Sequence, residues 1–240
     1  MRNKFISTAP VWRQSQYKGI PIGAVEGLHD EVGSLLTSLL PQNSSVLDMG
    51  AGHGALSLRL ADLGFGVSAI DKEDHFQPKG IPFQRIDLDK AVPQFGPFDA
   101  VCAVEVIEHI KNPSTLLADC WALIKPGGYL IVSTPNITSF LSRMIFLRTG
   151  RFHQFMDQDR LFGHITPLAL EEISYFLREI GYEIINVKSV GYLPLLFLEG
   201  GFGTLLNPKS LLFNAATLLL YPFMRGFKRG WCLIMAARRP

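Results

Sequence analysis

The chain has 240 residues, of which 48% are hydrophobic and 18% are charged, and its formal net charge is +2 at pH 7. This length and composition favour one α/β domain with a full hydrophobic core over two independent domains. The small net charge gives no strong signal for nucleic-acid binding, although basic residues collect near the C-terminus. Three cysteines (Cys102, Cys120 and Cys232) without metal or redox spacing, and an N-terminus without a secretory signal, indicate a cytoplasmic protein.

Secondary structure is predicted from residue periodicity along the chain. In the N-terminal region, residues 1–44, an apolar helical stripe covers 27–40. From Ser45 on, β-rich runs alternate with helical patterns, which is typical of βαβ units and a mainly parallel sheet. The expected strands are 45–49, 66–70, 83–86, 100–104, 129–133, 183–190 and 231–237, and the expected helices are 55–63, 113–124 and 168–180.

Two insertions interrupt this alternation. Residues 135–165 follow a strand and mix aromatic with basic residues, so we expect a lid over a site at the carboxyl edge of the sheet. Residues 191–230 are apolar and include a charge-free run, 210–224, with basic flanks. That run is shorter than the roughly 20 residues that span a bilayer. It predicts either an interfacial element on the inner membrane surface or a helix that packs on the sheet or on a second subunit of a homodimer.

The segment 46–54, Val-Leu-Asp-Met-Gly-Ala-Gly-His-Gly, predicts a cofactor cradle, in which a strand ends in a glycine-rich turn that begins a helix. Glycines allow backbone amides to approach a ligand closely, with the helix N-terminus behind them. Gly50, Gly52 and Ala55 also satisfy the dinucleotide pattern, and Asp71 can bind ribose hydroxyls in an NAD enzyme or in other nucleoside-binding enzymes. On these residues alone, an NAD-dependent dehydrogenase remains an alternative.

Further motifs separate these interpretations. The segments Ile86-Asp87-Leu88, Phe98-Asp99-Ala100-Val101 and Lys125-Pro126-Gly127-Gly128-Tyr129-Leu130 follow the cradle in order. Together they resemble the motifs of class I S-adenosylmethionine-dependent methyltransferases, over roughly residues 27–239. The resemblance implies an α/β, Rossmann-like, seven-stranded sheet with the last strand antiparallel and helices on both faces.

The same resemblance implies roles for the cofactor-binding residues. Gly50 and Gly52 approach the methionine portion of S-adenosyl-L-methionine, and Asp71, followed by Lys72, holds the ribose. Asp87 meets the adenine amino group with Leu88 beside it, and Val104 lies near the sulfonium. Asp48, also included in this set, orders the glycine loop.

A second motif, Glu105-Val106-Ile107-Glu108-His109, follows the fourth strand. If Glu105 begins a helical turn, Glu108 and His109 lie on its face, and two carboxylates meet one imidazole. This predicts a metal half-site, whereas the alternative is a solvated helix start in which His109 only contacts substrate or cofactor. Oxygen and imidazole ligands suit Mg²⁺, Mn²⁺, Fe²⁺ or Zn²⁺.

The motif resembles an E-x-x-E-H segment of ubiquinone-biosynthesis O-methyltransferases and of enzymes that methylate the terminal 2′-hydroxyl of small RNAs. In the latter, these residues and a later histidine hold a divalent cation. The resemblance makes Glu105, Glu108, His109 and His164 the expected metal ligands, with His153 as the competitor to His164. We expect His29 on the surface of the first helix.

The candidate catalytic residues are His109 and Glu108. Methyl transfer requires an aligned acceptor and a place for its proton, and a hydroxyl acceptor needs help to lose that proton. Either His109 removes it directly or the divalent cation lowers the pKa of the hydroxyl. We therefore expect O-methylation of a small or lipid-linked acceptor, with a non-catalytic cofactor-binding accessory subunit as the alternative.

Overall fold

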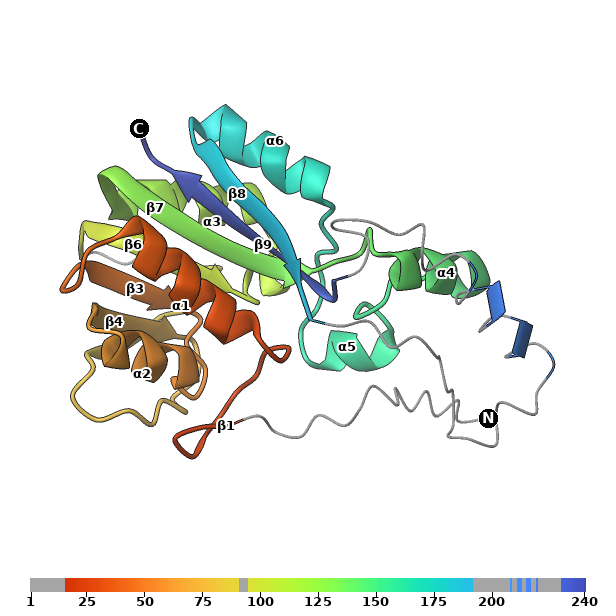
Figure 1. Ribbon diagram of the computed structural model, residues 1–240, viewed down its shortest axis with the longest axis horizontal. Helices are drawn as coiled ribbons and strands as arrows, with labels where there is room; N and C mark the ends of the chain where they lie inside the picture. Colours follow the sequence, from red (N-terminus) through yellow and green to blue (C-terminus); the bar gives the residue numbers. More distant parts are fainter. Residues whose placement is uncertain are drawn as a thin grey trace.

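The computed structural model describes residues 16–90, 95–191 and 230–240, together with 208, 211, 212, 215, 216 and 219. Within them a seven-stranded sheet has the order β5-β4-β3-β6-β7-β9-β8, and a separate hairpin pairs β1 with β2 (Figure 1). The strands are β1 (Gln16–Tyr17), β2 (Ile20–Pro21), β3 (Ser45–Met49), β4 (Gly66–Asp71), β5 (Phe83–Arg85), β6 (Phe98–Val104), β7 (Ile124–Pro135), β8 (Glu183–Val190) and β9 (Cys232–Arg238). The helices are α1 (Leu28–Leu39), α2 (Ala55–Asp62), η1 (Ile107–His109), α3 (Pro113–Leu123), α4 (Phe140–Thr149), α5 (Asp157–Leu161) and α6 (Leu170–Ile180).

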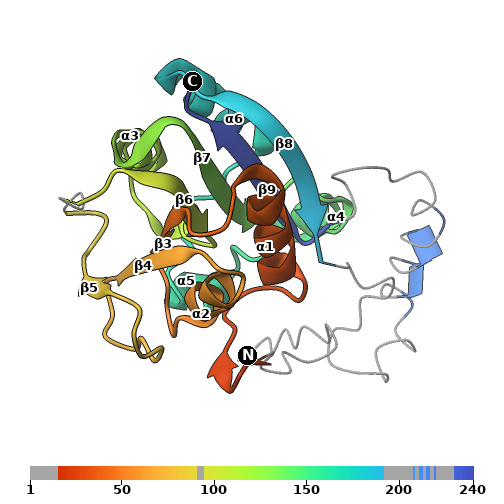
Figure 2. The ribbon, with the colours of Figure 1, turned by 60° about the vertical axis from the view of Figure 1, so that its left-hand side comes forward.

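The sheet confirms the predicted fold class. Strands β3 to β7 pair in parallel, and β9 runs antiparallel between β7 and β8. Strands β3 and β6 are buried almost throughout, because helices cover both faces of a parallel sheet. Helices α1 and α2 lie on one face of the sheet, and α3 and α6 lie on the other (Figures 1 and 2). Their leucines belong to two separate core clusters.

The carboxyl edge of the sheet collects the polar segments. Because β3, β4 and β6 are parallel, Met49, Asp71 and Val104 end at one edge, and the glycine turn, Lys72 and Glu105 follow them there. The lid segment predicted at 135–165 lies at this edge and contains α4 and α5 (Figure 1). Residues far apart in the sequence therefore meet where each strand ends.

The start of one strand and the position of one histidine differ from the expectations. Strand β7 starts at Ile124 rather than at Tyr129, because Ile124 pairs with Phe98 of β6, and Gly127 and Gly128 form backbone hydrogen bonds with Arg239. His29 is buried and not on the helix surface, and its Nδ1 has no hydrogen-bond partner among the described residues. Burial, reinforced by the charge of Arg59, lowers the pKa of His29 to about 4.

The apolar segment predicted at 191–230 falls almost entirely outside the described residues. Of its leucines, Leu211, Leu212 and Leu219 are described, and all three are exposed. No helix within the described part of the chain is both long and apolar enough to cross a bilayer.

Candidate active site

The glycine turn after β3 brings backbone close to the neighbouring loop. Gly50 has φ +77°, and a Cβ there would lie 2.3 Å from Val106 Cγ2, so a side chain would collide. Gly52 has φ +53° and open space where its Cβ would be. The turn therefore leaves room in front of Gly52, as a ligand cradle requires.

A pocket of about 270 Å³ opens at the carboxyl edge of the sheet. Five of the eight residues predicted to bind the cofactor line it, namely Gly50, Asp71, Lys72, Asp87 and Leu88. Glu105, Val106, His109 and Phe162 line it as well, so the ExxEH motif and the segment 135–165 border the same cavity as the glycine turn.

The other three predicted residues are not in the pocket lining. Asp48 is buried, and its Oδ2 accepts a hydrogen bond from Ser57 Oγ of α2 at 2.5 Å, which ties the strand end to the helix. Burial raises the pKa of Asp48 to about 6. Val104 is buried in the sheet, and Gly52 contributes its amide to a contact with Asp71.

Three acidic residues, Asp71, Asp87 and Asp89, line the pocket on the side of β4 and β5, and the first two were predicted to bind the cofactor. Asp71 Oδ2 accepts from the Gly52 amide and Oδ1 from the Glu73 amide, both at 2.8 Å. Asp87 pairs with Lys90 at 2.7 Å, and this ammonium group lowers the pKa of Asp87. Both carboxylates retain lone pairs for ligand hydroxyl or amino groups.

Glu105 does not begin a helical turn, so this part of the prediction is wrong. Its φ is +55°, and the helical turn η1 starts only at Ile107. Its Oε1 accepts from Ser133 Oγ at 2.8 Å, and Oε2 lies 3.2 Å from the Cys232 thiol, which donates to it. Strands β7 and β9 thus hold the carboxylate, whose pKa is raised by burial.

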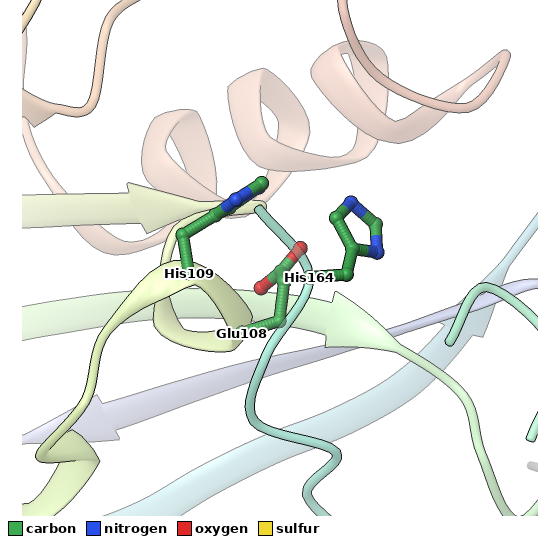
Figure 3. Close-up of side chains that lie close together, drawn as sticks. All are labelled: Glu108, His109 and His164. Atoms are coloured by element: carbon green, nitrogen blue, oxygen red, sulfur yellow. The ribbon is translucent and has the colours of Figure 1, made fainter. Parts of the chain in front are cut away.

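Glu108, His109 and His164 form a cluster in which one ligand atom of each residue lies within 4.8 Å of the others (Figure 3). Glu105 is not part of this cluster, so the structure brings together three of the four expected metal ligands. The rings of His109 and His164 are perpendicular, with centroids 4.7 Å apart.

The charges of this cluster are set by burial. Glu108 is fully buried, and neither of its carboxylate oxygens has a hydrogen-bond partner among the described residues. Burial, and then the nearby Glu105, raise the pKa of Glu108 well above its usual range. Burial, then His164 and Lys72, lower the pKa of His109 to about 4, so its ring is neutral at pH 7.

Backbone hydrogen bonds bring His164 to the motif. The carbonyl oxygen of Glu108 accepts from the amides of Ile165 and Thr166, both at 3.0 Å, and Thr166 Oγ1 donates to the carbonyl of Ile110 at 2.7 Å. His153, the competing candidate, packs its ring against Trp231 with centroids 4.3 Å apart and is not in the cluster.

The cluster fits a divalent cation. A buried carboxylate without hydrogen bonds is costly unless a positive charge compensates it. One carboxylate and two imidazoles form a mixed oxygen and nitrogen donor set, typical of divalent metal ions in proteins.

Three residues that support the site were not predicted from the sequence. Ser133 and Cys232 hold Glu105, and Gln154 holds His164, but no local spacing links these residues to the motif.

Comparisons with known proteins identify the family of the chain. A family model described as a methyltransferase domain matches residues 25–187. A ubiquinone biosynthesis O-methyltransferase from Xanthomonas axonopodis pv. citri is 30% identical over 215 residues, covering 80% of this chain and 84% of that protein. One of the same name from Burkholderia pseudomallei is 29% identical over 163 residues, covering 62% and 69%.

Solved structures share the fold. A SAM-dependent methyltransferase from Archaeoglobus fulgidus superposes with a TM-score of 0.59 at 17% identity, covering 88% of this chain and 94% of that one. The N-methyltransferase NodS from Bradyrhizobium japonicum, solved with S-adenosyl-L-homocysteine, gives 0.54 at 15% identity, covering 88% and 85%.

Proposed function

Because the chain belongs to the S-adenosylmethionine-dependent methyltransferases, we propose that it transfers the methyl group to a hydroxyl oxygen of an apolar acceptor. The cluster of Glu108, His109 and His164 beside the pocket carries this proposal. The relatives named above are O-methyltransferases, which agrees with a hydroxyl acceptor.

The pocket residues divide into two groups with different tasks. Gly50, Asp71 and Asp87 bind the cofactor, which supplies an electrophilic methyl group when bound. Glu105 and His109 border the pocket on the side of the ExxEH motif, where the acceptor oxygen is to be aligned with that methyl group. Alignment lowers the barrier because it removes the need to orient two reactants during the reaction.

The electrostatics favour metal assistance over direct base catalysis. A histidine with a pKa of about 4 is a weak base for a hydroxyl proton at pH 7, whereas its neutral ring is ready to bind a metal. Glu108, His109 and His164 would hold the cation, and a bound cation would supply the charge that lowers the pKa of an acceptor hydroxyl. Glu105 stays bound to Ser133 and Cys232 at the pocket wall.

The lid favours an apolar acceptor. Leu161, Phe162 and Ile165 flank His164 in sequence, and their side chains are exposed. Phe162 also lines the pocket. According to their names, the relatives act in ubiquinone biosynthesis. A hydrophobic or lipid-linked hydroxyl compound agrees both with these names and with the apolar side chains of the lid.

Methyl transfer from labelled S-adenosylmethionine tests the proposal. The acceptors are a hydroxylated aromatic compound with an alkyl tail and its amino analogue, each assayed before and after EDTA and again with Mg²⁺, Mn²⁺ or Zn²⁺ restored. We expect label on the hydroxyl oxygen, loss of turnover with EDTA and recovery with a cation. Label on nitrogen or carbon would contradict O-methylation, and cofactor binding without any transfer would support an accessory subunit.

A further inference from the structure

We propose that Gln154 is a positioning residue for His164, because its backbone carbonyl fixes the tautomer and orientation of that imidazole. His164 Nδ1 lies 2.8 Å from the carbonyl oxygen of Gln154. A carbonyl oxygen can only accept, so Nδ1 carries the proton. In a neutral imidazole this leaves the lone pair on Nε2, the ring nitrogen available to the cluster with Glu108 and His109. The inference deepens the proposed function, since it assumes that His164 acts in the site.

The backbone at Gln154 explains how the carbonyl reaches His164. The Phe155 amide donates to the Phe152 carbonyl at 3.1 Å, which closes a four-residue turn with Gln154 in third place. Gln154 has φ +65°, a left-handed conformation that turns of this kind reserve mainly for glycine or asparagine. A glutamine is therefore held in an unfavourable conformation at the residue whose carbonyl contacts His164.

Contacts on both sides of Gln154 hold this turn in place. The His153 amide donates to Ser142 Oγ of α4 at 3.1 Å, and the His153 ring packs on Trp231 next to β9. On the other side Phe155 is buried, and its ring centroid is 5.7 Å from that of His164. The position of the carbonyl is thus set by packing within the protein and does not depend on a bound ligand.

The side chain of Gln154 is separable from this backbone role. Its amide nitrogen is buried and has no hydrogen-bond partner among the described residues. The side chain lies close enough to the Cys232 thiol to lower the pKa of that thiol. Replacing the side chain with hydrogen removes this contact but keeps the backbone carbonyl and leaves the left-handed conformation accessible. Replacing it with a β-branched side chain disfavours that conformation and moves the carbonyl.

Two variants test the inference, Gln154→Gly and Gln154→Val. The control is Asn43→Val, because Asn43 has φ +64° in a loop outside the lid. Long-range ¹H–¹⁵N spectra of histidine-labelled protein, without cofactor or metal, report the tautomer, and the His164→Gln spectrum assigns the resonance. We expect Nδ1–H in the wild type, in Gln154→Gly and in Asn43→Val, and a shift toward Nε2–H in Gln154→Val.

A titration with Mn²⁺ alone gives a second readout. Loss of the group that orients a histidine ligand typically weakens metal binding about 10- to 100-fold, so we expect this loss in Gln154→Val and less than about twofold in Gln154→Gly. S-adenosylhomocysteine affinity should stay unchanged in both. If Gln154→Val does not fold, Gln154→Ala, which also disfavours positive φ, replaces it.

An unchanged His164 tautomer in the valine or alanine variant would overturn the inference. So would equal losses in Gln154→Gly and Gln154→Val, because the side chain rather than the carbonyl would then be responsible. The spectra are recorded without methyl transfer. Failure of the proposed O-methylation and failure of this inference therefore give different results. A tautomer shift without methyl transfer would support the role of Gln154 and refute only the proposed reaction.

Discussion

The backbone amide of Gly52 donates a hydrogen bond to Asp71 Oδ2 at 2.8 Å. This bond joins the glycine turn after β3 to the last residue of β4, so the two parts of the cofactor cradle support one another. A substitution at Asp71 therefore acts on the ligand and on the turn together.

Replacing Asp71 with alanine should weaken S-adenosylhomocysteine binding by about 1.5–3 kcal/mol, the typical contribution of a hydrogen bond to a charged group. Asp71→Asn should lie between alanine and wild type, because an amide keeps one acceptor oxygen. Calorimetry measures both, and Asp74→Ala, an exposed acid three residues away, is the control. Wild-type affinity in Asp71→Ala would contradict the assignment of this residue.

Comparing Gly52→Ala with Gly80→Ala distinguishes the loss of stability caused by backbone strain from a loss of ligand affinity. Both glycines have positive φ and no atom within 4 Å of an added Cβ, so each substitution should cost stability by about 1–2 kcal/mol. Only Gly52→Ala should weaken S-adenosylhomocysteine binding, because its Cβ enters the space in front of the glycine turn. Chemical unfolding and calorimetry measure the two effects, and equal affinities for the two variants would remove Gly52 from the cradle.

How far the sequence predicts the site depends on the range of the interactions. The glycine turn and Asp71 follow from strand ends that local patterns reveal, and the structure places both at the pocket. His164 was a candidate only through family resemblance, because hydrogen bonds to the Glu108 carbonyl bring it there from another segment.

The errors have a related cause. Helical spacing predicted a shared face for Glu105 and Glu108, but Ser133 and Cys232 on distant strands hold Glu105 in a left-handed conformation. Likewise, the helical pattern placed His29 outside, whereas the structure packs it into the core. Neither contact is encoded in the spacing of neighbouring residues.

His29 should make the protein sensitive to acid. Its pKa is about 4 in the folded chain and near 6.5 when unfolded, so the unfolded state binds the proton first as the pH falls. The contribution of the neutral ring to the free energy of unfolding is therefore fully present above pH 6.5, and it is lost as the pH falls toward 4. Of the neighbouring charges, Arg59 lowers this pKa and Asp30 opposes the shift.

His29→Leu removes this dependence. Between pH 7 and pH 4.5 the variant should lose about 2–3 kcal/mol less unfolding free energy than the wild type, as measured by urea unfolding. His75→Leu, at an exposed histidine, serves as the control. Parallel losses in wild type and His29→Leu would show that another group dominates the acid response.

The apolar run 210–224 with its basic flanks predicts association with membranes. The exposed Leu219 belongs to this run. We expect the wild type to float with anionic liposomes and the double variant Leu219→Asp with Leu220→Asp to float less, because carboxylates oppose insertion and repel anionic lipids. Leu63→Asp, at the partly exposed end of α2, is the control. Equal flotation of the double variant and wild type would remove this membrane contact.

The cluster of Glu108, His109 and His164 gives the most demanding prediction. Glu108→Gln, His109→Ala and His164→Ala should each lower turnover by orders of magnitude and leave S-adenosylhomocysteine affinity largely intact, because the cluster acts on the acceptor. The losses should not add in double variants, since removing one ligand already disables a shared site. Glu105→Gln should follow the same pattern only if Glu105 leaves Ser133 and Cys232 to join the cation.

His164→Ala is the most informative of these changes. It lies 55 positions after His109 in the sequence, so a matching phenotype requires a shared site. His153→Phe is the matched control, because it keeps an aromatic ring on Trp231 and removes the imidazole of the competing candidate. Three results together would refute the metal site: EDTA leaves the rate unchanged, His109→Ala lowers the rate and His164→Ala does not. His109 would then act as a base despite its low pKa, and the rate should fall only as the pH approaches 4.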